Sequence, residues 1–347
     1  MGIRIGKSII DEKSPVYIVA EMSANHLKDF KRAIEIIHIA KEAGANAIKL
    51  QTYKPDTITL DSDKECFLAT GKLWKGTKLY DLYKDAYTPW EWHAALCEEA
   101  NKIGIDCFSS PFDFSAVDLM TELSMPAFKI ASYEITDIPL IKYCASKGKP
   151  IIIATGVAEK EDIERAIKAC KEENNDQIIL LKCVSQYPTR YENVNLNMIT
   201  DLKEKYGTIV GLSDHSMGST VPIAAVALGA KMIEKHLTIK REDGGPDGAF
   251  SMEATEFEKM VKDIRITESA LGDKEYHLTE DQIKEKAGAR SLFISKDIKK
   301  GELLSKDNIK SVRPGIGLHP SKYYEVLGKK ATHDLFFADP LKEEDYE

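Results

Sequence analysis

Short apolar runs alternate with amphipathic stretches along the first 272 residues of the chain. Most of the runs are continuously apolar, which is typical of parallel strands that are buried on both faces. Eight such runs lie at residues 16–21, 47–51, 106–110, 127–132, 150–156, 178–184, 209–214 and 232–237. Apolar residues at helical spacing predict helices between them, most clearly at residues 30–45, 89–104, 162–173 and 257–272.

Eight strand–helix units in this order predict an α/β fold, a (β/α)8 TIM barrel over residues 1–272. The alternative is an open doubly wound sheet. That fold normally has a glycine-rich turn after its first strand, whereas this chain continues from its first apolar run with EMSANH, residues 21–26. The barrel is therefore the favoured prediction.

Residues 52–88 interrupt the repeating pattern and are too long for an ordinary connection between a strand and a helix. In a barrel, an excursion at this point lies over the carboxyl ends of the strands, where barrel enzymes carry their active sites. Trp74, Tyr80 and Tyr83 of this segment either line a substrate pocket or pack on the barrel rim.

The chain changes character after Gly272. Residues 273–288 are polar and predict a linker with a short helix, and residues 289–347 combine short strands with frequent Gly and Pro turns. A domain of about 60 residues is close to the lower limit for independent folding. We therefore expect the C-terminal domain to rely on the barrel or on a partner subunit.

Composition narrows the class of protein. The net charge of −8 argues against general nucleic-acid binding, which usually needs a basic face. The chain has no apolar run long enough for a membrane span and no recognisable signal peptide, so we expect no membrane association. The six cysteines form no CxxC pair and are expected to be reduced thiols in a cytoplasmic protein.

Polar and ionisable residues gather where the predicted strands end, which is where a barrel places its active site. Such groups are costly inside buried strands unless they are paired or used. The strand-end residues are Glu21, Lys49, Gln51, Ser109, Ser110, Lys129, Ser132, Glu134, Thr155, Lys182, Ser185, Ser213, Asp214, His215, Glu234 and His236. A lysine–glutamate salt bridge across the barrel would explain some of them, but polar ends on all eight strands favour a functional site.

The residue types suggest the chemistry of this site. Lys49 and Lys129, together with several hydroxyl groups, suit a small phosphorylated anion. Glu21 and Glu134 are candidate acid–base or sugar-binding carboxylates. His215 and His236 end neighbouring strands and are either two ligands of one open divalent-metal site, suited to Mn²⁺, Mg²⁺, Co²⁺ or Fe²⁺, or unrelated histidines.

Several motifs resemble the sialic-acid synthase family of phosphoenolpyruvate-condensing enzymes over nearly the whole chain. They are AEMSANH (20–26), IKLQTY (48–53), SSPFD (109–113), KIASYEI (129–135), LLKCVSQYPTRYENVNL (180–196), GLSDHS (211–216), IEKHLT (233–238) and GGPDGAFSMEA (244–254). Within the family, residues 20–29 and 240–253 look like the subgroup of pseudaminic acid synthases rather than the N-acetylneuraminate or legionaminate synthases. The resemblance implies a barrel followed by an antifreeze-like (SAF) domain.

The resemblance also implies a reaction, in which phosphoenolpyruvate, an N-acetylated amino sugar and water give a nonulosonic acid and phosphate. The residues matching positions that bind phosphoenolpyruvate are Lys49, Ser110, Lys129, Ser132, Thr155, Ser185 and Ser213. The remaining matches are His215 and His236 as ligands of Mn²⁺, Mg²⁺ or Co²⁺, Glu21 and Gln51 near the sugar and the ion, Glu134 and Tyr187 near the reacting centre, and Asp247 as a sugar-binding carboxylate. Glu21, Glu134 and Tyr187 are the implied catalytic residues.

The family resemblance further implies a domain-swapped homodimer, in which Arg313 of one subunit reaches the sugar site of the other. Three other readings remain on the sequence alone. A class II aldolase would use a divalent ion and pyruvate, and a second kind of aldolase would form a Schiff base on Lys129. The third reading is a non-enzymatic binding protein. A repetitive Thr face in the C-terminal segment would favour it, but that segment has a single threonine, Thr332.

Overall fold

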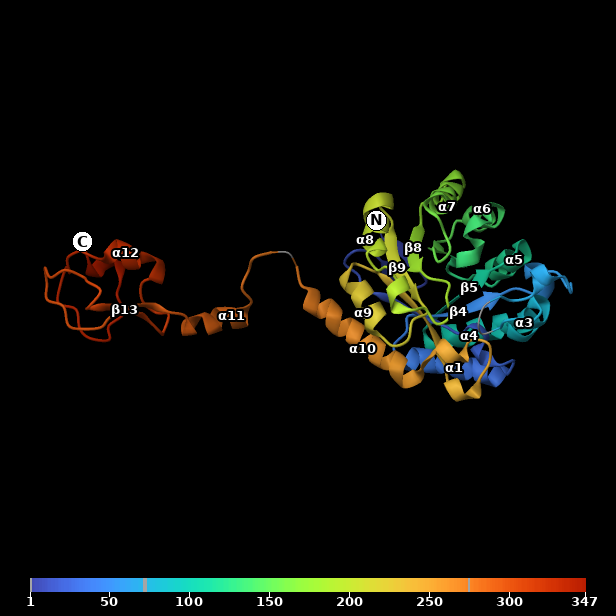
Figure 1. Cartoon of the computed structure of the whole chain (residues 1–347), viewed down its shortest axis with the longest axis horizontal. Helices are drawn as coiled ribbons and strands as arrows, with labels where there is room; N and C mark the ends of the chain where they lie inside the picture. The colour runs from blue at the N-terminus through green and yellow to red at the C-terminus, as the bar shows by residue number, and fades with distance from the viewer. Residues whose placement is uncertain (1, 71–73, 274) are drawn as a thin grey trace. The chain divides into compact units, whose positions relative to one another are not determined.

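The computed structural model describes residues 2–70, 74–273 and 275–347. The chain divides into two compact units, Met1–Gly272 and Asp273–Glu347. The larger unit carries the barrel, and the smaller one is rich in turns (Figure 1). Among the described residues, no helix is long and apolar enough to cross a membrane.

A closed parallel barrel forms the centre of the larger unit. Its strands are β3 (Tyr17–Glu21), β4 (Ala47–Thr52), β5 (Asp106–Pro111), β6 (Phe128–Ile130), β7 (Ile151–Ala154), β8 (Ile178–Cys183), β9 (Ile209–Asp214) and β10 (Met232–Thr238). Each strand pairs in parallel with the next, and β10 pairs with both β9 and β3. All eight predicted strands are confirmed, and the open-sheet alternative is wrong because the pairing of β10 with β3 closes the barrel.

Helices surround the barrel in the order that the sequence pattern predicts. They are α1 (Phe30–Glu42), α4 (His93–Ile103), α5 (Phe114–Glu122), α6 (Ile138–Ser146), α7 (Lys160–Glu172), α8 (Met198–Tyr206), α9 (Thr220–Ala227) and α10 (Ala254–Leu271). Helix α1 illustrates why these segments are helical. Asp29 caps its first turn, and Ala33, Ile36, Ile37 and Ala40 are buried on one side. The helix predicted at 89–104 is split, with a 3-10 turn at Trp90–Trp92 before α4.

An N-terminal hairpin, β1 (Ile3–Ile5) and β2 (Ser8–Ile10), precedes the barrel and was not anticipated from the sequence. Ile5 and Ile10 are buried in the same apolar core as the barrel strands. The tight turn at Gly6 has φ +53°, and a Cβ atom there would lie 2.0 Å from the Asp106 carboxylate. Glycine is therefore required for both the backbone conformation and the close approach.

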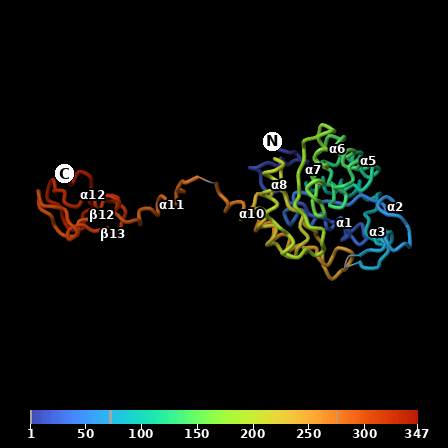
Figure 2. The backbone as a smooth tube through the Cα atoms, turned by 45° about the horizontal axis from the view of Figure 1, so that its top comes forward, coloured from blue at the N-terminus to red at the C-terminus, as the bar shows by residue number. Residues whose placement is uncertain are grey.

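The excursion between β4 and α4 contains two short helices, α2 (Pro55–Ile58) and α3 (Leu79–Ala86), and a 3-10 turn at Glu65–Phe67. Both helices lie together at one edge of the barrel (Figure 2). The segment contributes to a cavity that also includes residues from the strand ends, which confirms its predicted place over the carboxyl ends of the strands.

The C-terminal unit has its own small core. It contains α11 (Glu280–Glu285), the antiparallel pair β12 (Ser291–Ile294) and β13 (Ile309–Val312), and α12 (Tyr323–Val326). The buried apolar residues of this core are Leu292, Ile294, Ile298, Leu304, Ile309, Val326, Ala331, Leu335 and Leu341.

Candidate active site

The last residues of β10 alternate between two faces of the barrel wall, as strand geometry requires. Glu234 and His236 share the inner face, where they meet groups from other strands. Lys235 takes the opposite face, where its Nζ contacts Asp214 and donates to the Ser216 carbonyl. Because all three partners are buried, this ion pair ties the end of β9 to β10 next to the inward-facing site residues.

Two lysines and two carboxylates meet inside the barrel. Lys49 Nζ lies 2.6 Å from Glu21 Oε2 and 3.6 Å from Glu234 Oε1, and Lys129 Nζ also lies 3.6 Å from Glu234 Oε1. Ser213 donates a 3.0 Å hydrogen bond to the same Glu234 oxygen. All of these residues are buried, so the site holds a compact set of mutually paired charges. Lys49 also donates to the Ser110 hydroxyl at 3.3 Å.

The environment shifts the proton affinities within this cluster. Burial raises the pKa of Glu21 to about 7, although the Lys49 ammonium opposes the shift. Burial acts on Glu234 in the same direction, but Lys129 and Lys49 outweigh it and hold its pKa below the usual value. Burial lowers the pKa of Lys129. Burial acts on Lys49 in the same direction, but the carboxylates of Glu21 and Glu234 outweigh it and raise the pKa of Lys49.

Glu234 is one of the strand-end residues that the sequence places at the site, without a role of its own, and it contacts both lysines. Because Glu234 and His236 are two residues apart on one strand, their side chains share a face. Ser23 was missed in the sequence. Its hydroxyl donates to Asp247, and it accepts a 3.2 Å hydrogen bond from Gln51, which also donates to Glu21 at 3.1 Å. Gln51 and Asp247 are thus joined to the charged cluster through Glu21 and Ser23.

The two predicted metal ligands lie side by side, with ring centroids 5.2 Å apart. His215 Nδ1 lies 3.0 Å from the Val184 carbonyl, so a proton on Nδ1 leaves Nε2 free for an ion. This is how a metal-binding imidazole is usually oriented. His236 Nδ1 is buried and has no hydrogen-bond partner among the described residues. The two neighbouring imidazoles are therefore the residues that would hold a divalent ion at this site.

Aromatic rings enclose the histidines. The ring of Tyr187 lies 4.4 Å from that of His215, and Phe250 lies 4.9 Å from His236. Burial lowers the pKa of His236 well below its usual value, and His215 adds to the effect. A neutral imidazole is the form that binds a metal ion. Cys183, which the sequence suggested was an ordinary buried thiol, lies 4.0 Å from His215 Nδ1 at the edge of this site.

Three predicted hydroxyl residues lie beside β7 and β8. Ser132 accepts a 3.1 Å hydrogen bond from the Gly156 amide, and Thr155 donates at 3.1 Å to the Leu181 carbonyl. The Ser185 hydroxyl is buried and has no partner among the described residues. A Cβ atom on Gly156 would lie within 2.6 Å of both the Ser132 and Ser185 oxygens, so the absence of a side chain there keeps a space between two hydroxyl groups.

A cavity of about 470 Å³ opens beside these groups. Its polar lining includes Gln51, Ser132, Glu134, His236 and Asp247. Burial raises the pKa of Glu134 to about 7, and one of its oxygens has no hydrogen-bond partner among the described residues. Glu134 therefore faces the cavity with a proton affinity suited to general acid–base catalysis.

The aromatic residues of the excursion have different positions. Trp74 and Tyr83 line the cavity, and the Trp74 ring lies 6.1 Å from Tyr187. Tyr80 is not among the lining residues. The pocket interpretation therefore holds for two of the three.

Arg313 is the one predicted site residue in the C-terminal unit, where it is exposed directly after β13. The other predicted site residues all belong to the barrel unit, Met1–Gly272.

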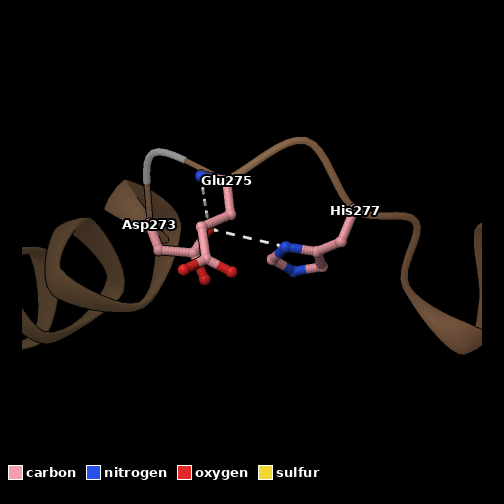
Figure 3. A group of neighbouring side chains, drawn as sticks. All are labelled: Asp273, Glu275 and His277. Carbon is pink, nitrogen blue, oxygen red and sulfur yellow. Dashed lines mark hydrogen bonds and ion pairs between the residues drawn. The ribbon is translucent and has the colours of Figure 1, made fainter.

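A second cluster of potential ligands lies in the segment after α10 (Figure 3). Asp273, Glu275 and His277 offer ligand atoms within 4.8 Å of one another, and all three are exposed. His277 Nδ1 lies 3.6 Å from Asp273 Oδ1. Exposed acidic groups of this kind are commonly solvated charges, so we assign no metal to this cluster.

A parallel barrel with a cavity and polar groups at the carboxyl ends of its strands is the arrangement of TIM-barrel enzymes. The chain belongs to the NeuB family, whose model matches residues 36–276, and the SAF domain matches residues 289–347. The family assignment confirms the resemblance seen in the motifs.

Similar proteins cover almost the whole chain. A pseudaminic acid synthase from Campylobacter jejuni subsp. jejuni serotype O:23/36 is 48% identical over 99% of this chain and 100% of its own. One from Helicobacter pylori is 46% identical over 96% of this chain and 98% of its own. The solved N-acetylneuraminic acid synthetase from Leptospira borgpetersenii, in complex with citrate, has 33% identity and a TM-score of 0.74, covering 82% of this chain and 95% of its own.

Proposed function

We propose that this chain is a pseudaminic acid synthase. It would condense phosphoenolpyruvate with 2,4-diacetamido-2,4,6-trideoxy-L-altrose and water to give pseudaminic acid and phosphate. The observation that carries the proposal is the identity of 48% to a pseudaminic acid synthase across essentially the full length of both chains. The alternative is an N-acetylneuraminate or legionaminate synthase, since an N,N'-diacetyllegionaminic acid synthase from Legionella pneumophila is 35% identical over 92% of this chain.

The lysines and hydroxyl groups of the barrel would hold phosphoenolpyruvate. Lys49 and Lys129 supply two positive charges. The hydroxyl groups would come from Ser110 beside Lys49, Ser213 beside Glu234, and Ser132 and Ser185 on either side of Gly156. Thr155 would shape the same pocket through its bond to the Leu181 carbonyl. Because Glu21 has a pKa near 7, it can take up a proton when the anion enters, which would reduce the negative charge beside the phosphate.

His215 and His236 would hold a divalent ion, Mn²⁺, Mg²⁺ or Co²⁺. When bound, such an ion supplies Lewis-acid polarisation of a carbonyl oxygen. The residues around it have separate tasks. Asp247 and Gln51 would orient the sugar through hydrogen bonds, while Tyr187 and Phe250 pack against the two imidazoles.

The reaction balances with phosphate as the leaving group. C3 of phosphoenolpyruvate forms a bond to the aldehyde carbon of the open-chain sugar, the aldehyde oxygen gains a proton, and the oxygen of water adds to C2. The bond between C2 and the phosphate oxygen then breaks, the C2 hydroxyl becomes the ketone of the product, and its proton passes to the leaving phosphate. Glu134 would accept the proton from the attacking water, since it faces the cavity and its pKa lies near 7.

We further propose a domain-swapped homodimer in which Arg313 of one subunit binds the N-acetylated sugar in the other. The exposure of Arg313 supports this role. A reduced, cytoplasmic enzyme is consistent with six free cysteines, of which Cys66 is the exposed one. The proposed partners are the two substrates and a second copy of the chain, and they include neither a nucleic acid nor a membrane.

A panel of sugars tests the proposed function. The purified full-length chain is incubated with phosphoenolpyruvate, Mn²⁺ and one of three sugars: the diacetamido-trideoxy-L-altrose, its legionaminate counterpart or N-acetylmannosamine. We expect phosphate release and a nonulosonic acid product with the first sugar, at a kcat/KM at least about tenfold above the others. Turnover only with N-acetylmannosamine would instead identify an N-acetylneuraminate synthase. Consumption of pyruvate without phosphate release would identify an aldolase.

A further inference from the structure

Helix α3 presents a narrow apolar face to the cavity. Leu79, Leu82, Tyr83 and Ala86 follow the spacing i, i+3, i+4 and i+7, which places all four on one side of the helix. All four line the cavity, together with Ile58 at the end of α2. The charged residues Asp81, Lys84 and Asp85 are exposed.

An apolar helix face of this kind normally packs against a protein core. Here none of the residues of α3 is buried, and the same four residues surround open space. The helix is nevertheless anchored, because the Tyr83 ring meets Tyr53 at 5.7 Å and Tyr53 meets Phe112 at 5.2 Å. The apolar face is therefore held in place, and no side chain of the described residues, 2–70, 74–273 and 275–347, fills the space in front of it.

The other side of the cavity is chemically different. Gln51, Ser23, Asp247, Glu134 and His236 form a polar wall next to the candidate catalytic groups. A ligand that fills the cavity must combine a polar, reactive end with substituents that tolerate an apolar surface. A sugar with a hydroxyl group at every carbon would place some of those groups against leucine and isoleucine without hydrogen-bond partners.

We propose that Ile58, Leu79, Leu82 and Ala86 form a specificity surface for the apolar substituents of the sugar, namely a deoxy methyl group and the methyl groups of acetamido substituents. This inference rests on the proposed function and adds to it the part of the site that selects a deoxygenated sugar over a fully hydroxylated one. An apolar pocket distinguishes one such group by roughly ten- to two-hundredfold in kcat/KM.

The test compares two sugars with one variant of the full chain. Leu82→Asn keeps the approximate size of the side chain but makes the surface polar. We expect it to lower the ratio of kcat/KM for the diacetamido-trideoxy sugar to that for N-acetylmannosamine by about tenfold or more. The KM for phosphoenolpyruvate should stay within about twofold of the wild-type value, because the lysine cluster is unchanged.

Matched controls separate selectivity from folding. Leu82→Met retains an apolar surface and should retain the wild-type ratio, and Asp85→Asn changes an exposed residue on the same helix. If Leu82→Asn does not fold, Ile58→Asn carries the same test from α2.

An unchanged sugar ratio in the polar variants would overturn the proposal, whether the rates with both sugars stay the same or fall equally. If sedimentation also shows a changed oligomeric state, the apolar face belongs to a contact with a second copy of the chain. The proposed function fails separately, since it is contradicted when the wild-type protein does not turn over the diacetamido-trideoxy-L-altrose.

Discussion

Replacing His236 with alanine is expected to lower metal-dependent turnover by more than about a hundredfold while leaving the barrel folded. The estimate is a lower bound, because even the groups that orient a metal ligand are usually worth 10- to 100-fold. The barrel should stay folded because of the environment of the His236 ring. The ring is buried, its pKa is far below the usual value, and Nδ1 has no hydrogen-bond partner among the described residues. Removal of the ring therefore leaves no buried protein charge unpaired.

The matched control is His38→Ala, because His38 lies on α1 with a side chain 42% exposed and pairs with Glu99 at 2.9 Å. It should retain wild-type turnover. Metal binding is measured directly by titration with Mn²⁺, and folding by circular dichroism. If the His236 variant binds Mn²⁺ with wild-type affinity and responds normally to added metal, the two histidines do not form a metal site.

Replacing Glu134 with glutamine is expected to lower kcat by roughly a hundredfold or more and to remove an acidic limb from the pH profile. Burial raises the pKa of Glu134 to about 7. The carboxylate is the form that accepts a proton from water, so activity carried by Glu134 should fall as the pH drops below about 7. The ratio of wild-type to variant kcat/KM, measured from pH 5.5 to about 9, cancels the titration of the substrate.

Glu21 provides the comparison, because burial raises its pKa to about 7 as well. The Glu21→Gln variant should keep the acidic limb even if its overall rate is reduced. The assignment would be wrong if the limb persists in Glu134→Gln and disappears in Glu21→Gln. That result would make Glu21 the proton acceptor.

Continuous apolar runs were sufficient to predict the barrel, because a strand buried on both faces needs apolar residues at nearly every position. Their polar ends also predicted the site. His215 follows directly after β9, and His236 lies near the end of β10. Because the two strands are hydrogen-bonded neighbours, strand order alone brings the two rings together. Local pattern and global fold agree over this part of the chain.

Other structural features depend on contacts between segments that are far apart in the sequence, and a local pattern does not predict such contacts. The two strands of the N-terminal hairpin have 3 residues each, which is too short for an argument from periodicity, so their pairing in the structure establishes them. Glu234 reads as one more polar strand residue until its partners on β4 and β6 are known. The apolar face of α3 has the periodicity of a core helix, and only the cavity distinguishes it from one.

The fate of the bridging oxygen of phosphoenolpyruvate tests the central claim most directly. The full-length chain is given the diacetamido-trideoxy-L-altrose, Mn²⁺ and phosphoenolpyruvate labelled with oxygen-18 between C2 and phosphorus. The released phosphate is then analysed by mass spectrometry. Condensation with addition of water to C2 predicts that the phosphate carries the label. Unlabelled phosphate would show cleavage of the bond between phosphorus and oxygen, and it would contradict the condensation proposed for this site.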